Sequence, residues 1–458
     1  MSDNLSMLDS LPHEILTNVF VRLPIKSIVT CTTVCKTWKS LIQNPTFISN
    51  HLHHSSNNNN KHPLLLFRLC SLELAEAVSE MTVEENEKEQ YVLHFDNQDF
   101  NEYARFDDFA FHGQSYGGIF HVVGTCNGLI FLADDLYGYH YNFFLWNPCV
   151  RKFVKLPKPN ITFFSHGGYD ATVGFGFDSK TNDYKVVRFV TLEEKGQKGK
   201  SPPEVEVYSL STGKWRMVTA LPPIGAARGR EPEAFVNGAL HWVALRKTGN
   251  KFLNFVMVFD LGDEVFREIA LPKLSDQNGD EYWVRVSISA YGNSLALFQR
   301  GFSIHCFGIW VMKDYADASS WTKIISWADE GLIEGIPRSH CMPTAIGFRK
   351  SGEVILEMYG GYLVSRDLET QEIKDLRIRG YANTFADSYV ESLVLLDKPN
   401  QQRKRQKRKR NNNRKQICGP MLYKIHRFQF FSRCKTQNRS WSKHSKHRKG
   451  NNLGGSNS

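Results

Sequence analysis

The pattern that decides the fold appears in two neighbouring stretches, "CNGLIFLAD" (Cys126–Asp134) and "FFLWNPCVRKFVKLP" (Phe143–Pro157). In the first, an Asn-Gly pair precedes a short apolar run. In the second, an apolar run ends at Asn-Pro and another run follows. Short apolar runs separated by such turn residues are typical of antiparallel β-hairpins. The two stretches therefore predict four short strands in succession.

The same plan recurs along the chain. The second stretch has counterparts in "VEVYSLSTGKWRMV", "VMVFDLGDEVFREIALP", "IWVMKDYADASSWTKII" and "YLVSRDLETQEIKDLRI". The first has counterparts in "VGFGFDSKTNDYKVVRFV", "FVNGALHWVAL", "ISAYGNSLALFQ" and "IGFRKSGEVILEM". Equivalent points are separated by 62, 51, 52 and 54 residues, at Trp146, Tyr208, Phe259, Val311 and Ser365. A four-strand unit at such a period predicts propeller blades, of which five can be counted.

A sixth blade can be assembled from segments at the two ends of this region. "PLLLFRL" and "YVLHF" lie near its start, and "YVESLVLL" (Tyr389–Leu396) lies at its end. Joining them would cover strand edges that are otherwise exposed. A two-sheet sandwich is the rival architecture, but the regular period argues against it. We therefore expect a mainly β fold with a propeller-like domain of about six blades over residues 63–398.

The N-terminal segment, residues 5–52, has helical periodicity instead. Pro12 fits the first turn of a helix, and apolar residues then recur at helical spacing, at Ile15, Leu16, Val19 and Leu23. A second helix is predicted to carry Ile28, Cys31, Val34 or Cys35, Trp38, and Leu41 or Ile42 on one face, and a third starts at Pro45. Three short helices bury too little surface to be very stable alone. They either pack on the main body or bind a partner, and periodicity leaves both open.

The amino-acid composition distinguishes two further segments of the chain, a polar linker and a basic tail. Residues 53–62, "HHSSNNNNKH", predict a polar linker. Residues 399–458 form a basic tail, because positions 401–458 hold 18 of the 57 lysines and arginines and no acidic residue, which leaves 39 basic against 47 acidic residues before them. We expect this tail to be disordered.

One basic block in the tail has the composition of a segment that binds the acidic groove of a nuclear import receptor. It could also bind a nucleic acid weakly. The alternative is that the tail is a solvated extension without a ligand. The block consists of Arg403, Lys404, Arg405, Lys407, Arg408, Lys409 and Arg410.

No arrangement of residues predicts catalysis, a cofactor or a metal. "GFGFD" (Gly174–Asp178) lacks the further glycine and the Lys-Ser/Thr ending of a phosphate loop. His121, His241 and His305 are isolated, and Cys126 reads as a buried thiol. The odd number of scattered cysteines predicts an intracellular protein without disulfides, and no apolar run approaches the roughly 18 residues of a membrane span. We expect a non-enzymatic protein of nucleus and cytoplasm.

The opening segment "LPHEILTNVFVRLPIKSIVTCTTVCKTWKSLIQNPTFI" (Leu11–Ile48) resembles the F-box, through its two Leu-Pro pairs and "VCKTWKSLI". Downstream, a series of motifs over roughly residues 120–397 resembles the plant F-box-associated interaction domain. These motifs are "CNGLI", "WNP", "FGFD…NDYKVV", "VEVYSL…W", "NGALHWVA", "FDL…F", "IWVMKDY" and "YVESLVLL". The chain is similar to F-box/kelch-repeat-like plant proteins.

The resemblance implies the substrate receptor of an SCF-type (Skp–cullin–F-box) ubiquitin ligase. The F-box would bind a Skp-family adaptor and, through it, the cullin and RING subunits, while the β domain would capture an unknown target protein for ubiquitination. The matching F-box positions, adaptor-facing or internal, are Leu11, Pro12, Ile15, Leu16, Leu23, Pro24, Ile28, Val34, Cys35, Trp38 and Leu41. The alternative is a nuclear protein that associates with nucleic acid through its basic tail.

Overall fold

The computed structural model describes residues 12–58, 63–70, 89–107, 120–133, 142–194, 197–198, 203–223, 226–227, 233–248, 251–274, 285–300, 307–326, 343–380 and 384–399. These residues belong to one compact unit, residues 1–403. The predictions for Leu11 and for the basic block at 403–410 lie outside the described residues.

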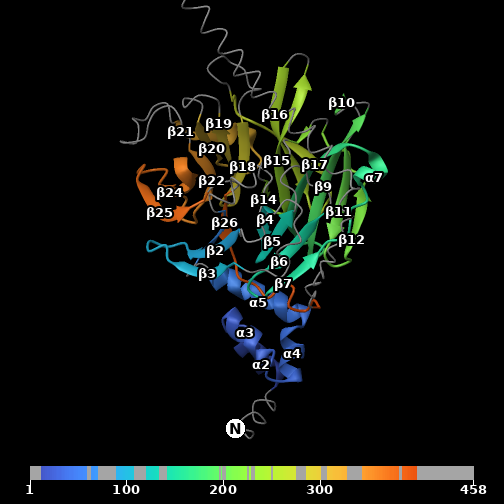
Figure 1. The fold of residues 1–458 in the computed structure, drawn as a ribbon, viewed down its shortest axis with the longest axis vertical. Coiled ribbons are helices and arrows are strands. Elements are labelled where there is room, and N and C mark those ends of the chain that lie inside the picture. The colour runs from blue at the N-terminus through green and yellow to red at the C-terminus, as the bar shows by residue number, and fades with distance from the viewer. Residues whose placement is uncertain are drawn as a thin grey trace, which may run out of the picture. The chain divides into compact units, whose positions relative to one another are not determined.

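Six antiparallel sheets make up the β domain, as blades of a propeller (Figure 1). Blade 1 has the order β26 (Phe385–Tyr389), β1 (Leu64–Leu69), β2 (Gln90–Phe95) and β3 (Glu102–Phe106). Blade 2 comprises β4 (His121–Cys126), β5 (Leu129–Ala133), β6 (Phe143–Asn147) and β7 (Lys152–Lys155). Blade 3 comprises β8 (Tyr169–Asp178), β9 (Asp183–Glu194), β11 (Glu204–Ser209) and β12 (Lys214–Val218), with β10 (Gln197–Lys198) paired to β9.

Blades 4 to 6 repeat the plan. Blade 4 comprises β14 (Ala234–Val236), β15 (Ala239–Thr248), β16 (Lys251–Asp260) and β17 (Phe266–Ala270), with β13 (Ala226–Ala227) paired to β15. Blade 5 comprises β18 (Arg285–Tyr291), β19 (Ser294–Arg300), β20 (Gly308–Met312) and β21 (Trp321–Ser326). Blade 6 comprises β22 (Thr344–Phe348), β23 (Val354–Glu357), β24 (Tyr362–Arg366) and β25 (Ile373–Arg379). The short helical turns are α7 (Phe163–His166), η3 (Ala318–Ser320) and η5 (Tyr359–Gly361).

The predicted blades are confirmed, and the first strands of successive blades contact one another in a closed ring. β4 contacts β8, β8 contacts β14 and β15, β14 and β15 contact β18, β18 contacts β22, and β22 contacts β26, which returns to β4. The Asn-Gly turns that the sequence predicts connect the first two strands of blade 2 and of blade 4. Asn127 and Gly128, like Asn237 and Gly238, all have positive φ, as a tight turn between antiparallel strands requires.

The strand that closes the ring lies earlier in the chain than the sequence predicts. The closing strand is β26, which pairs with β1 from Phe385↔Arg68 to Tyr389↔Leu64. The rest of "YVESLVLL" leaves the sheet, and we call residues 390–399 the C-terminal strap. Leu393, Val394, Leu395 and Leu396 are all buried, whereas a half-covered strand would bury alternate residues. The run therefore packs on all sides as an irregular segment.

The described part of the helical module contains four helices, where the sequence predicted three. They are α2 (His13–Phe20), α3 (Ile25–Cys31), α4 (Lys36–Ile42) and α5 (Pro45–Asn58). The predicted second helix is interrupted because the Thr32 and Thr33 hydroxyls bond to the carbonyls of Val29 and Thr30, at 2.6 and 2.7 Å, and so compete with helical hydrogen bonding. α4 then begins anew, with the Cys35 Sγ accepting from the Trp38 N–H at 3.4 Å.

α5 continues to Asn58 and so occupies part of the segment predicted as a polar linker. The His51 side chain explains how this polar stretch stays helical, since it is buried, with Nε2 3.4 Å from the Leu23 carbonyl oxygen and Nδ1 3.3 Å from the Ser55 hydroxyl. Figure 1 shows α5 between the propeller and the other helices.

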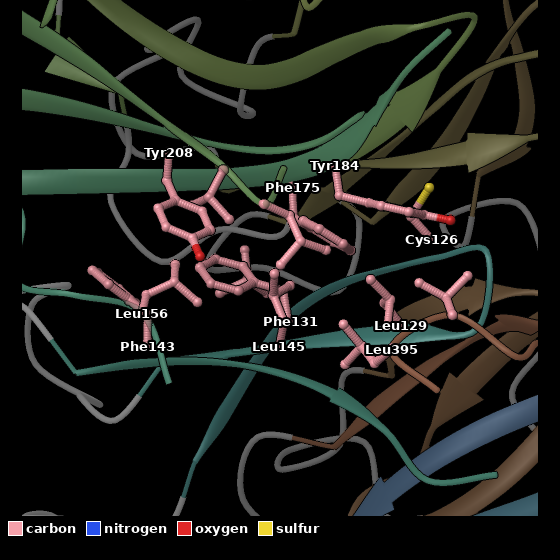
Figure 2. Packing of buried hydrophobic residues seen from close by; sticks show 14 of the residues in the cluster. Cys126, Leu129, Phe131, Phe143, Leu145, Leu156, Phe175, Tyr184, Tyr208 and Leu395 are labelled. Atoms are coloured by element: carbon pink, nitrogen blue, oxygen red, sulfur yellow. The ribbon is translucent and has the colours of Figure 1, made fainter. Parts of the chain in front are cut away.

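One hydrophobic cluster joins the helical module to the propeller. It combines Phe47 and Ile48 of α5 with the strap and with residues of blades 2 and 3. Figure 2 shows part of this cluster, where Leu395 of the strap joins the aromatic rings of Phe131, Phe143 and Phe175. The Gln43 side chain also donates to the Leu396 carbonyl at 3.1 Å. The position of the module on the propeller is therefore set by packing and by the strap.

Candidate partner-docking site

α2 carries an exposed apolar surface on the helical module. Ile15 and Val19 lie one turn apart and are 47% and 49% exposed. Leu16 and Phe20 lie one position further along and are buried, so the two faces of the helix are cleanly divided. Val34, between α3 and α4, is also exposed, at 43%. Such exposed side chains on a small helical module indicate a protein partner.

The structure separates the predicted motif positions into three groups by burial, which periodicity could not do. Leu16 and Ile28 are core residues. Leu23, Cys35, Trp38 and Leu41 are half-buried, whereas the exposed positions are Pro12, Ile15, Pro24 and Val34. We assign only the exposed group, together with the accessible parts of the half-buried one, to contact with a partner. Leu11 precedes the first described residue.

The sequence interpretation missed several residues that support this surface from beneath. Phe20 packs edge-on against Trp38, with ring centroids 4.9 Å apart. Ile25, Phe47 and Ile48 complete the same interior, together with Ile42, which the sequence had offered as an alternative to Leu41. The four-residue spacing from Leu16 to Phe20 was the available signal, but it competed with the equally regular spacing from Ile15 to Val19.

Trp38 carries an unmet polar group within this site. Its indole Nε1 is buried and has no hydrogen-bond partner among the described residues. Tyr and Trp side chains that combine an apolar ring with a donor are common in protein interfaces, because a partner can satisfy the donor while burying the ring.

Burial shifts the pKa values of two titratable groups at the site in the direction that favours the neutral form of each group. Burial raises the pKa of the Cys31 thiol, which therefore stays protonated and unreactive at neutral pH. Burial also lowers the pKa of His51, although its contact with the Leu23 carbonyl opposes the shift. Both groups therefore favour their neutral forms within the helical module.

Two residues that the sequence set aside as non-catalytic are buried in the fold. Cys126 lies within the apolar cluster beside Tyr184, and burial raises the pKa of its thiol (Figure 2). His241 is fully buried and bonded at both ring nitrogens. His305 lies outside the described residues.

The described part of the chain offers neither a metal site nor a membrane-spanning helix. It holds no cluster of three or more His, Cys, Asp or Glu residues suited to a metal ion. No helix in it is long and apolar enough to cross a membrane.

Comparison with known proteins places both regions in characterised families. The family described as "F-box-like" matches residues 8–54, and the "F-box associated beta propeller domain" matches residues 83–395. The chain is 28% identical to the F-box protein CPR1 of Arabidopsis thaliana, over 84% of this chain and 89% of that protein. It is 24% identical to the F-box/kelch-repeat protein At3g23880 of the same plant, over 71% of this chain and 84% of that protein.

Proposed function

The chain belongs to the F-box proteins with an F-box associated β-propeller domain, and from that premise we propose that it is the substrate receptor of an SCF-type ubiquitin ligase. Its helical module binds a Skp-family adaptor, and through it the cullin and RING subunits, while the propeller captures the target protein. The observation that carries the adaptor assignment is the exposed pair Ile15 and Val19, on a helix whose opposite face is buried.

The receptor acts by proximity and makes no covalent bond itself. Holding a target's lysines near a ubiquitin-conjugating enzyme raises their effective concentration, which replaces a bimolecular encounter by a nearly intramolecular one. This benefit requires a fixed distance between adaptor and target. The cluster shared by α5, the strap and blades 2 and 3 supports such a fixed connection.

The test is adaptor capture by full-length protein carrying Ile15→Asp and Val19→Asp. Because a carboxylate in an apolar interface loses its hydration without compensation, we expect capture to fall by at least tenfold. Leu253→Asp on β16 is the matched control, since Leu253 is 45% exposed but lies on the propeller. Unchanged urea unfolding of all variants would show that the fold is intact.

Equal adaptor capture by the double variant and the wild type would overturn the assignment of this surface. Failure of the wild-type chain to capture any Skp-family adaptor would overturn the receptor function itself.

We also propose that the protein is distributed between nucleus and cytoplasm, with the basic block at 403–410 as the import signal. The support is the sequence alone, through its seven lysines and arginines within eight residues.

A further inference from the structure

Two arginines face each other at one end of blade 5. Arg285 opens β18 and Arg300 closes β19, and the register of the two strands pairs them directly. Both side chains are exposed. Like charges directly opposite each other on neighbouring strands are destabilising. This arrangement therefore carries a cost that a bound anion would relieve.

A small cavity lies beside the pair, between blades 5 and 6. Its volume is about 90 Å³, and Ser287, Gln299 and Thr344 line it together with the two arginines. Arg300 donates from Nη1 to the Thr344 hydroxyl at 2.9 Å, which holds the guanidinium at the cavity wall. Arginine, serine and threonine side chains are the usual donors to carboxylate and phosphate groups.

Several other arginines of the propeller are neutralised within the fold. Arg68, Arg188, Arg246 and Arg349 each form an ion pair with a carboxylate. Within the described residues, no ion pair involves Arg285 or Arg300.

One carboxyl group does act on the pair. Burial raises the pKa of Glu357 to about 7, although Thr384 and Arg300 both lower it. Glu357 lies opposite Thr344 in the β22–β23 register. At neutral pH this carboxyl is only partly ionised, so the cavity keeps a net positive charge.

The pair lies at the end of its blade that is remote from the helical module. In blade 2 the β4–β5 turn lies next to the end of β26, where the strap begins, because the Tyr389 hydroxyl donates to the Gly128 carbonyl at 2.9 Å. The equivalent turn of blade 5 contains Gly292 and Asn293. Arg285 and Arg300 are at the opposite ends of the strands that this turn connects.

We propose that the cavity formed by Arg285, Arg300 and Thr344, here called the arginine pocket, binds an acidic side chain of the target protein, either a carboxylate or a phosphate. The inference rests on the proposed receptor function and adds the chemistry of the recognised residue. A phosphate or carboxylate would accept from both guanidinium groups and from the Thr344 hydroxyl, which releases the repulsion between the two arginines.

The test measures fluorescence anisotropy of labelled peptide pools, randomised except for a central phosphoserine, glutamate or serine, with the full-length protein. We expect the phosphoserine or glutamate pool to bind at least tenfold more tightly than the serine pool, and the order of these two to identify the anion. Arg285→Ala with Arg300→Ala should abolish the preference. Thr344→Val, which keeps both charges, should weaken binding by a smaller factor.

Arg267→Ala is the matched control, because Arg267 is a 51% exposed arginine on β17. The basic tail is present in every variant, so its attraction for anions cancels in the comparison. Equal binding of all three pools, or an unchanged preference in the double variant, would overturn the proposal. Adaptor capture by the same variants should be unchanged, so failure of the pocket and failure of the receptor function give different results.

Discussion

His241 on β15 is held in one neutral form by its two hydrogen bonds. Nδ1 donates to the Ala234 carbonyl at 3.0 Å, which leaves Nε2 to accept from the Tyr315 hydroxyl at 2.9 Å. Burial, aided by the charge of Arg267, lowers the pKa of this histidine to about 4. A proton on Nε2 would place a charge in the core and reverse the direction of the hydrogen bond to Tyr315.

This arrangement predicts a pH-dependent contribution to stability. An unfolded histidine binds a proton below about pH 6.5, but folded His241 does so only near pH 4, so the free energy of unfolding falls as the pH drops between these values. The loss attributable to His241 is about 3 kcal/mol at pH 4. Urea unfolding of wild type and His241→Gln, from pH 7.5 to 4, checks this. Parallel pH curves for the two proteins would contradict the prediction.

The sequence predicted which residues belong to the F-box motif, but it did not predict which of them are exposed and which are core. Ile15 and Leu16 are adjacent and equally apolar, yet one is exposed and the other is core. Their roles depend on how α2 packs against the rest of the module, where Phe20, one turn after Leu16, contacts Trp38 of α4.

Among the elements, the strap is anchored by a buried side chain of blade 2. Asn147 is fully buried, and its Nδ2 donates to the carbonyls of Ser392 and Val394 at 3.0 and 2.9 Å. Its Oδ1 accepts from the Cys149 N–H at 3.0 Å. The "WNP" motif at Trp146–Pro148 thus has a physical explanation, since the asparagine satisfies backbone groups that an irregular buried segment cannot satisfy itself.

Replacing this residue should loosen the strap. Asn147→Ala leaves two strap carbonyls and one N–H without these partners, and we expect the free energy of unfolding to fall by about 3 kcal/mol. Asn160→Ala is the control, because Asn160 is exposed on the connection between blades 2 and 3. The measurement is the urea midpoint of each variant. A midpoint for Asn147→Ala equal to that of the control would contradict the role assigned to Asn147.

The sequence predicted helices and strands correctly where the pattern that determines them lies within a few neighbouring residues. The blade hairpins follow from alternating apolar runs and Asn-Gly turns, both of which lie within a few residues. The α3–α4 interruption and the strap were missed for opposite reasons. Apolar residues continue at helical spacing across Thr32 and Thr33, whose hydroxyls end the helix, and Leu393–Leu396 is apolar enough to suggest a strand although packing surrounds it on all sides.

For the whole molecule, the repeat period predicted the propeller but could not locate its closure. Five blades are each continuous in sequence, whereas blade 1 joins β26 to β1, more than 300 positions earlier. The strap then connects this closure to the helical module. Tyr103 of β3 marks the junction, since its hydroxyl donates to Glu391 at 3.0 Å and its ring lies 5.0 Å from the Lys26 Nζ.

The last strap contact shows where the chain can be shortened without removing a described residue. The Lys152 Nζ donates to the Lys398 carbonyl at 2.5 Å, so the hydrogen bonds described for the strap are all kept in a chain that ends at Pro399. We therefore expect deletion of residues 400–458 to leave both the melting temperature and adaptor capture unchanged. A chain ending at Tyr389 loses the strap and should aggregate or unfold, since four buried apolar residues and their hydrogen bonds are removed.

The same deletion separates the two roles predicted for the basic block. If Arg403–Arg410 binds an import receptor, a fluorescent fusion ending at Pro399 should lose nuclear accumulation several-fold. In a full-length variant, each lysine of the block is replaced by arginine and each arginine by lysine. This variant should keep its nuclear accumulation, because the charge of the block is retained. If the tail instead binds nucleic acid, the full-length protein should retain RNA or DNA in a strongly salt-dependent manner and the shortened one should not. Nuclear accumulation equal in the two lengths would exclude the block as the import signal.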